Sequence, residues 1–164
     1  MTVYRVVHNT VKHLLIGSGN EGRWCSHKRK VIYTSSSVAL ACLENILRRS
    51  GSGFSTSFRT IFYEIPDDII IEEVLNKNLD GNWRLQSSYH YCQTIGNNWY
   101  DKKDALILKV PSAIIPDEFN YVIKTNSPNI NRIRIAEIKR FLPDERLENI
   151  LKSVDIFKLK KAGA

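Results

Sequence analysis

The residue with the clearest potential for chemistry is Glu44, which lies among apolar residues. Only one other acid, Glu21, occurs in the first sixty residues. On a helical wheel Glu44 falls between Leu40 and Leu47, so its carboxylate borders an apolar face. Such a carboxylate either forms an i,i+4 ion pair with Arg48, which would stabilise the helix by about a few tenths of a kcal/mol, or is kept for chemistry.

Arg5 is a second polar residue in an apolar setting. The stretch 3–7 is β-branched and aromatic enough for a strand, and alternation places Arg5 on the same side as Val3 and Val7. A guanidinium on a buried face is costly to desolvate. We therefore expect that this face either borders a polar cleft or is left in water.

The elements that must position Glu44 follow one another directly. Residues 31–34 are β-branched and aromatic and predict a strand. Three serines at 35–37 supply candidate N-caps for a helix over 38–49, which the Ser-Gly repeat at 50–53 cannot continue. The expected apolar face of this helix consists of Ala39, Leu43, Ile46 and Leu47, with Asn45, Arg48 and Arg49 on the opposite face.

The rest of the chain mixes strands and helices. We expect strands over 57–65, 105–110, 120–124 and 130–138, loop and helix over 76–103, and a closing helix over 143–153. The run 69–75 suits either a strand or a short helix. Because consecutive strands occur as well as helices, the order favours an α+β fold over a doubly wound sheet. The length of 164 residues predicts a single domain over 1–164, with a basic tail at 158–164 that we expect to fray.

Charge is distributed unevenly along the chain. Residues 1–60 hold nine basic and two acidic side chains, a balance of +7. The balance is −5 over residues 61–123 and +5 over residues 124–164. This order suggests an anionic ligand or partner near the termini, although solubility and internal charge complementarity would produce the same pattern.

The composition is that of an ordinary soluble protein, with 43% hydrophobic and 25% charged residues. No stretch approaches the roughly 20 apolar residues that span a bilayer, and the N-terminal stretch lacks the apolar core of a secretory signal. Cys25, Cys42 and Cys92 are odd in number and include no CxxC pair, which fits a reducing interior. We therefore expect a cytoplasmic protein that does not bind a membrane.

Several common chemistries lack their motifs. There is no GxxxxGK[ST] loop, no strand-linked GxGxxG and no GxSxG elbow. The histidines do not fall at metal-ligand spacing with the cysteines, and Cys25-Ser26-His27 is a lone close pair, so we expect no metal. A pI of about 9.4 permits nucleic-acid binding, but neither a helix-turn-helix nor an aromatic RNA-reading motif is present.

A series of short motifs nevertheless resembles the RES-domain family, the toxin half of a class of bacterial toxin–antitoxin pairs. Each motif is weak alone, and their order and spacing over nearly the whole chain make the match specific. The motifs are Tyr4-Arg5, Gly22-Arg23-Trp24, Val31 to Ser35, Ala39-Leu40-Ala41, Leu43-Glu44, Gly96-Asn97-Asn98-Trp99, Val110 to Pro116, Asn120-Tyr121 and Asp144 to Leu147.

The resemblance implies a fold, an activity and a named set of residues. The family takes its name from an arginine, a glutamate and a serine, which map onto Arg5, Glu44 and Ser112. The implied fold is that of ADP-ribosyltransferase toxins, a split β-sandwich with flanking helices and a cleft for NAD. The implied activity is consumption of cytosolic NAD, by hydrolysis or phosphorolysis of the nicotinamide–ribose bond or by transfer of ADP-ribose to a protein.

Within this resemblance the polar residues have chemical roles. Glu44 would stabilise the oxocarbenium-like charge that develops on the ribose as nicotinamide leaves. Arg5, with Arg23 as a second candidate, would bind the diphosphate. Tyr33 would stack on the nicotinamide ring.

Three further residues complete the expected site. Ser112 would place a hydroxyl at the cleft floor, and Trp24 and Asn120 would contact the ligand, with Trp24 alternatively packing its own turn. From the residues alone, Tyr33 would be a core aromatic and Ser112 a turn residue.

The resemblance also implies partners, and the chain departs from the family at two places. The usual partner is an antitoxin that blocks the cleft and carries a helix-turn-helix domain, so DNA would be contacted only through it; a homodimer within that complex is compatible with the family. Cys25 replaces a usual Asn, and Lys124 to Pro128 replaces an Asn-Pro-x-His-Pro-like run, which concerns the cleft rim and the acceptor. The alternative from another class is a non-catalytic module that binds nucleic acid or protein.

Overall fold

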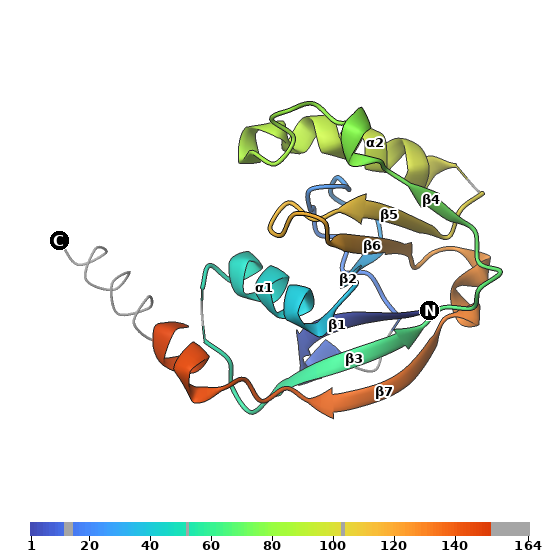
Figure 1. Cartoon of the computed structure of the whole chain (residues 1–164). Helices are drawn as coiled ribbons and strands as arrows, with labels where there is room; N and C mark the ends of the chain where they lie inside the picture. Colours follow the sequence, from blue (N-terminus) through green and yellow to red (C-terminus); the bar gives the residue numbers. More distant parts are fainter. Residues whose placement is uncertain (12–14, 52, 103, 152–164) are drawn as a thin grey trace.

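Within residues 1–11, 15–51, 53–102 and 104–151, which the computed structural model describes, seven strands form one sheet in the order β4-β5-β6-β2-β1-β3-β7 (Figure 1). β4 and β5 are parallel, and every other neighbouring pair is antiparallel. The stretch 158–164, expected to fray, lies outside the described residues. The strands are β1 (Thr2–His8), β2 (Val31–Ser35), β3 (Phe58–Glu64), β4 (Ile71–Glu73), β5 (Ile107–Pro111), β6 (Phe119–Lys124) and β7 (Arg134–Arg140), and the α-helices are α1 (Val38–Arg48) and α2 (Tyr89–Asp101).

The sheet opens between β1 and β2. These two strands share a single register pair, Tyr4 with Ser35, whereas β1 pairs with β3 along its whole length. Figure 1 shows β4, β5 and β6 above and β1, β3 and β7 below this opening. One apolar core joins both halves through Val3, Val7, Ile32, Ile61, Tyr63, Ile107 and Ile123. The mixed α+β fold and the split sandwich expected from the sequence are thereby confirmed.

Helix α1 follows β2 and packs against β1, but not on the face that we expected. Its N-cap is Ser37, whose Oγ accepts a hydrogen bond from the Leu40 backbone N–H at 3.1 Å. Asn45, assigned to the polar face, is buried, and Leu47, assigned to the apolar face, is 59% exposed. The reason is a specific contact, because Asn45 Nδ2 donates to the Val6 carbonyl of β1 at 2.7 Å.

Helix α2 covers the other half of the molecule and packs on β5 and β6 (Figure 1). Its buried residues are Cys92, Gly96 and Trp99. Gly96 is required by a close approach, since a Cβ there would lie 1.7 Å from the Trp24 carbonyl oxygen. No helix within the described ranges has the length and apolar character needed to cross a membrane.

Three expected elements differ in extent from the observed ones. The stretch 130–138 was wrong as a continuous strand, because Pro128–Arg132 forms a 3-10 turn and β7 begins only at Arg134. Ser127 caps this turn by accepting from the Asn129 backbone N–H at 3.3 Å. The ambiguous run 69–75 contains only the short strand β4, and within the described residues the closing helix covers 145–151.

Candidate active site

Glu44 is held by a buried polar chain that joins both sides of the opening. Asn120 Nδ2 on β6 donates to Glu44 Oε1 at 2.5 Å, and Ser35 Oγ on β2 donates to Asn120 Oδ1 at 2.7 Å. Ser35 and Asn120 are direct register partners. Among the described residues Glu44 makes no ion pair with Arg48, so the helix ion pair is not the account of this glutamate.

The surroundings of Glu44 act on its pKa in opposite directions. Burial raises the pKa of Glu44, because removing an ionised carboxylate from water is unfavourable. The hydrogen bond from Asn120 and the positive charge of Arg23 lower it. The carboxylate is thus kept in a partly desolvated position where its charge acts strongly on a bound group.

Arg23 is engaged by the loop that precedes α2. Its guanidinium donates to the carbonyls of Trp83, Arg84 and Leu85 at 2.6, 2.8 and 3.1 Å. It also lies over the Tyr89 ring, 4.5 Å from the centroid. Arg23 therefore has two effects. Its charge lowers the pKa of Glu44, and its three hydrogen bonds hold the loop before α2 in place.

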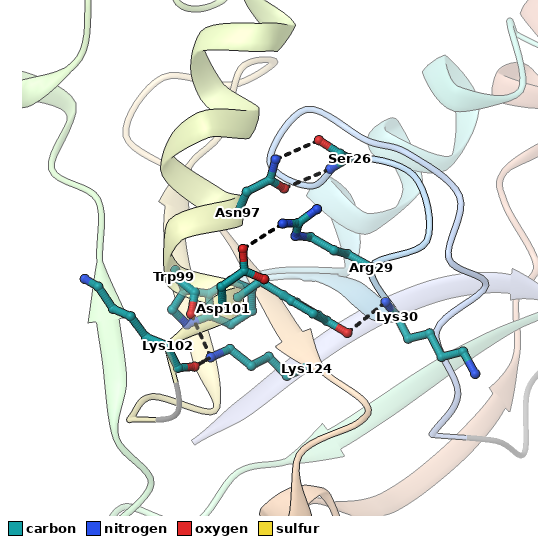
Figure 2. Close-up of polar contacts among 9 residues, drawn as sticks. Ser26, Arg29, Lys30, Asn97, Trp99, Asp101, Lys102 and Lys124 are labelled. Atoms are coloured by element: carbon teal, nitrogen blue, oxygen red, sulfur yellow. Dashed lines mark hydrogen bonds and ion pairs between the residues drawn. The ribbon is translucent and has the colours of Figure 1, made fainter.

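The loop that carries Arg23 is anchored on the C-terminal half of α2 (Figure 2). The Ser26 backbone N–H donates to Asn97 Oδ1 at 3.1 Å, and Asn97 Nδ2 donates back to Ser26 Oγ at 2.7 Å. Arg29 pairs with Asp101 at 2.7 Å. These contacts hold residues 26–29 on α2.

A buried lysine closes the end of α2. Lys124 Nζ donates to the carbonyls of Trp99 at 2.7 Å and Lys102 at 2.6 Å, and it lies over the Trp99 ring (Figure 2). A cation at a helix C-terminus satisfies carbonyls that have no partner within the helix. One of the two departures from the family pattern thus secures α2.

Tyr33 lies beneath the same loop, and Trp24 is part of the loop. A Cβ on Gly22 would be 2.7 Å from the Tyr33 hydroxyl oxygen, so the loop passes directly over the ring. Burial, with the neighbouring Cys25 second, raises the pKa of Tyr33 well above its ordinary value, and burial raises the pKa of Cys25 to about 11. Trp24 is 3% exposed and packs against Trp83, so its ring lies in the core. The ligand contacts expected of both residues stay predictions.

Ser112 shapes the turn after β5. Its side chain is enclosed, with the residue 1% exposed, and its Oγ accepts from the backbone N–H groups of Ile114 and Ile115, both at 3.1 Å. It lies two residues beyond Val110, the register partner of Asn120, and so at the same end of the sheet as the Glu44 contact. A catalytic role for its hydroxyl stays a prediction.

Arg5 is connected to the site by its effect on Arg48. It lies opposite Ile61 in the β1–β3 ladder, and its positive charge, with that of Arg49, adds to burial in lowering the pKa of Arg48. Arg48 follows Glu44 by one turn of α1. The structure therefore brings Glu44, Asn120 and Arg23 together and places Arg5 beside the next turn of the same helix.

Ser35 is a site residue that the sequence reasoning missed. It was named as one of three candidate caps and as the end of the motif Val31 to Ser35, without a role in the site, whereas Ser37 is the N-cap and Ser35 bonds to Asn120. The available signal was strand alternation, which places Ser35 on the same side of β2 as Tyr33.

Comparisons with known proteins identify the family of this chain. The family model described as RES domain matches residues 2–147. A protein named Toxin Res from Pseudomonas putida is 33% identical over 138 residues, covering 81% of this chain and 92% of that protein. Prs ADP-ribosylating toxin from Sphingobium sp. is 28% identical over 128 residues, covering 77% of this chain and 80% of that protein.

A solved structure shows the same fold. The crystal structure of the M. tuberculosis MbcT-MbcA toxin-antitoxin complex contains a chain that matches with a TM-score of 0.67 at 18% identity, covering 93% of this chain and 88% of that one. At this identity the likeness establishes the architecture only. With the family model matched over residues 2–147 and the identity to Toxin Res, this chain belongs to the RES-domain family.

Proposed function

We propose that this protein is the toxin of a type II toxin–antitoxin pair and that it cleaves the nicotinamide–ribose bond of NAD. Membership of the RES-domain family and relatives named as toxins support the toxin role. The single observation that carries the chemistry is the partly buried Glu44 carboxylate, held by Asn120 in a basic surrounding.

The proposed reaction uses Glu44 as an electrostatic partner of the ribose. As the bond breaks, neutral nicotinamide leaves with the bonding electron pair and positive charge develops on the ribose carbon. The Glu44 carboxylate stabilises that charge, directly or through a ribose hydroxyl. Water then adds its oxygen to the ribose carbon and releases a proton, which gives ADP-ribose; phosphate in the place of water would give a phosphorylated ADP-ribose.

The guanidinium groups near Glu44 suit the anionic part of NAD. Among the described residues, neither Arg5 nor Arg48 forms an ion pair with a carboxylate, and the positive charge of Arg5 helps to lower the pKa of Arg48. Two like charges without a counter-ion favour binding of a diphosphate, which guanidinium groups contact with paired hydrogen bonds. Tyr33 remains the proposed contact for the nicotinamide ring, Ser112 the proposed hydroxyl at the cleft floor, and Trp24 and Asn120 proposed ligand contacts.

Transfer of ADP-ribose to a protein is the second candidate, favoured by the name of one relative, Prs ADP-ribosylating toxin. The same cleavage step serves both reactions, and they differ only in the acceptor. The complex containing MbcT supports an antitoxin as partner. We propose that this partner carries a helix-turn-helix domain and blocks the NAD cleft, that residues 1–164 act as one cytoplasmic domain, and that the complex includes a homodimer.

Three measurements separate the candidates. Purified protein is incubated with NAD, with and without phosphate, while free nicotinamide and the ribose product are quantified. Hydrolysis gives ADP-ribose at the same rate in both buffers, and phosphorolysis requires phosphate. In the third measurement, NAD labelled in its adenylate part is added to a cell lysate, where protein transfer leaves label on a discrete band. Absence of nicotinamide release in every arm would refute the proposed function.

A further inference from the structure

The hydroxyl of Ser35 is connected to Glu44 through the side-chain amide of Asn120. We infer that Ser35 is a positioning residue, which fixes the Asn120 side-chain amide so that its nitrogen, and not its oxygen, faces Glu44. This inference rests on the proposed function only for its catalytic consequence, because the positioning itself is a property of the folded protein.

The buried side chains of Ser35 and Asn120 have few hydrogen-bond partners. Ser35 and Asn120 are 3% and 9% exposed, so water cannot supply their hydrogen bonds. Among the described residues, the Ser35 hydroxyl has one bond, to Asn120 Oδ1 at 2.7 Å. If the amide were turned over, the Ser35 proton would lose its acceptor and the amide oxygen would face the Glu44 carboxylate. Only the observed arrangement satisfies all three side chains.

The backbone makes this arrangement rigid. Ser35 and Asn120 lie directly opposite each other in the β2–β6 ladder, where side chains on one face approach closely. Glu44 comes from a separate element, α1, and meets the pair at 2.5 Å. The Ser35–Asn120 pair thereby transfers the fixed geometry of the sheet to a carboxylate on a helix.

Each of the three serines at 35–37 makes a different set of contacts. Ser37 caps α1 and also donates to Glu118 Oε2 at 3.0 Å. Ser36 donates to the same carboxylate oxygen at 3.0 Å. Ser35 alone is directed to Asn120. Within three consecutive residues, Ser37 therefore caps α1, Ser36 contacts Glu118 and Ser35 contacts the site through Asn120.

Loss of the Ser35 hydroxyl should weaken the bond that stabilises ionised Glu44. The charged groups on the elements packed around Glu44 are Arg23 before β2, Arg48 and Arg49 on α1, Arg5 on β1 and Glu118 before β6. Burial already raises the pKa of Glu44, and the Asn120 bond opposes that rise. If the Asn120 amide is no longer fixed, its hydrogen bond should lower the pKa of Glu44 by less, so Glu44 should ionise at a higher pH.

The test compares Ser35→Ala with Thr34→Val as the matched control. Thr34 is the adjacent residue of β2, is equally buried and donates to the Tyr121 carbonyl at 3.0 Å, but has no connection to Glu44. The pKa of Glu44 is measured by carboxyl carbon NMR titration in both variants, in Asn120→Ala and in the double variant. The acid limb of the pH profile for nicotinamide release is measured in parallel.

Asn120→Ala should raise the pKa of Glu44 by about one unit, as expected for one hydrogen bond to a charged group. Ser35→Ala should raise it by less, and adding Ser35→Ala to Asn120→Ala should change nothing more. The acid limb should move in parallel. No shift in Ser35→Ala, the same shift in Thr34→Val, or additive shifts would overturn the inference. Absent nicotinamide release in the wild type would refute the proposed function, and the titration would still decide the positioning role.

Discussion

Replacement of Gly96 by alanine should destabilise the protein, although the same change stabilises most helices. Gly96 lies inside α2 and packs directly on the backbone of Trp24. A Cβ at this position would be 1.7 Å from the Trp24 carbonyl oxygen and 2.7 Å from its carbonyl carbon. Because both contacts are with backbone, no side-chain rotation relieves them, and the helix and the loop must separate by more than 1 Å.

The expected magnitude comes from two opposing effects. Alanine gains about 1 kcal/mol over glycine through its helix propensity. Overpacking typically costs about 1–3 kcal/mol, and a hard backbone contact belongs at the upper end of that range. The net loss should be about 2 kcal/mol, which corresponds to a fall in Tm of about 4–8 °C for a domain of this size. The displaced loop also carries Arg23, which acts on Glu44, so the activity should fall together with the stability.

Gly81→Ala supplies the control. A Cβ at Gly81 would meet no atom within 4 Å, so this variant should keep the Tm of the wild type to within about 2 °C. Thermal denaturation followed by circular dichroism measures both variants under the same conditions. A Gly96→Ala protein as stable as the wild type would refute the assignment of Gly96 as the contact point between α2 and the loop.

Three further variants test single contacts. Glu44→Gln should be more stable than the wild type at pH 8, because a raised pKa means that ionised Glu44 destabilises the fold. The gain should be much smaller at pH 4, below the ordinary value of 4.5, where the carboxyl is mostly protonated in both the folded and the unfolded state. Equal urea midpoints of the two proteins at pH 8 would contradict this expectation. Lys124→Met should lower the free energy of unfolding by about 1–3 kcal/mol, because two carbonyls lose their donor. Lys102 is exposed, so Lys102→Met should change the free energy of unfolding by under about 0.5 kcal/mol. Similar losses for the two variants in urea denaturation would refute the capping role of Lys124. Arg23→Ala should speed amide hydrogen exchange in the loop before α2 about tenfold or more. Arg84→Ala should not, although the guanidinium groups of Arg23 and Arg84 both lie over the Trp83 ring. Unchanged exchange in Arg23→Ala would show that the three hydrogen bonds from Arg23 to backbone carbonyls do not hold the loop.

Elements that depend on local chemistry could be predicted from the sequence. The β-branched run before the serines forms β2, and a serine caps the helix that follows. The sequence leaves the N-cap open among three serines, because each has the same side chain. Tertiary contacts make the difference, since Ser35 is directed to Asn120 and only Ser37 accepts from the helix backbone.

The orientation of α1 could not be predicted from its pattern of apolar residues. A helical wheel treats Asn45 as polar and therefore exposed, but its amide finds the Val6 carbonyl in a strand far away in sequence. One specific hydrogen bond thus rotates the buried face and leaves Leu47 exposed. Likewise Glu44 meets Asn120, 76 residues further along the chain, in preference to the local ion pair with Arg48.

The candidate site shows the same division between local and distant information. Motif resemblance identified Glu44, Arg23 and Asn120, which the structure brings together. It included Ser35 in the run Val31 to Ser35 but assigned it no role, because that role depends on the register between β2 and β6. Register between distant strands is set by the whole sheet, so it is not visible in either strand alone.

Nicotinamide release by the wild type and by Glu44→Gln tests the central claim most directly. Glu21→Gln is the matched control, because Glu21 is the other acid in the first sixty residues and is exposed. The wild type and Glu21→Gln should release nicotinamide from NAD at the same rate, and Glu44→Gln should be slower by about 100-fold or more while remaining folded. Equal rates in all three proteins, or no release by any of them, would contradict the assignment of Glu44 as the group that promotes cleavage.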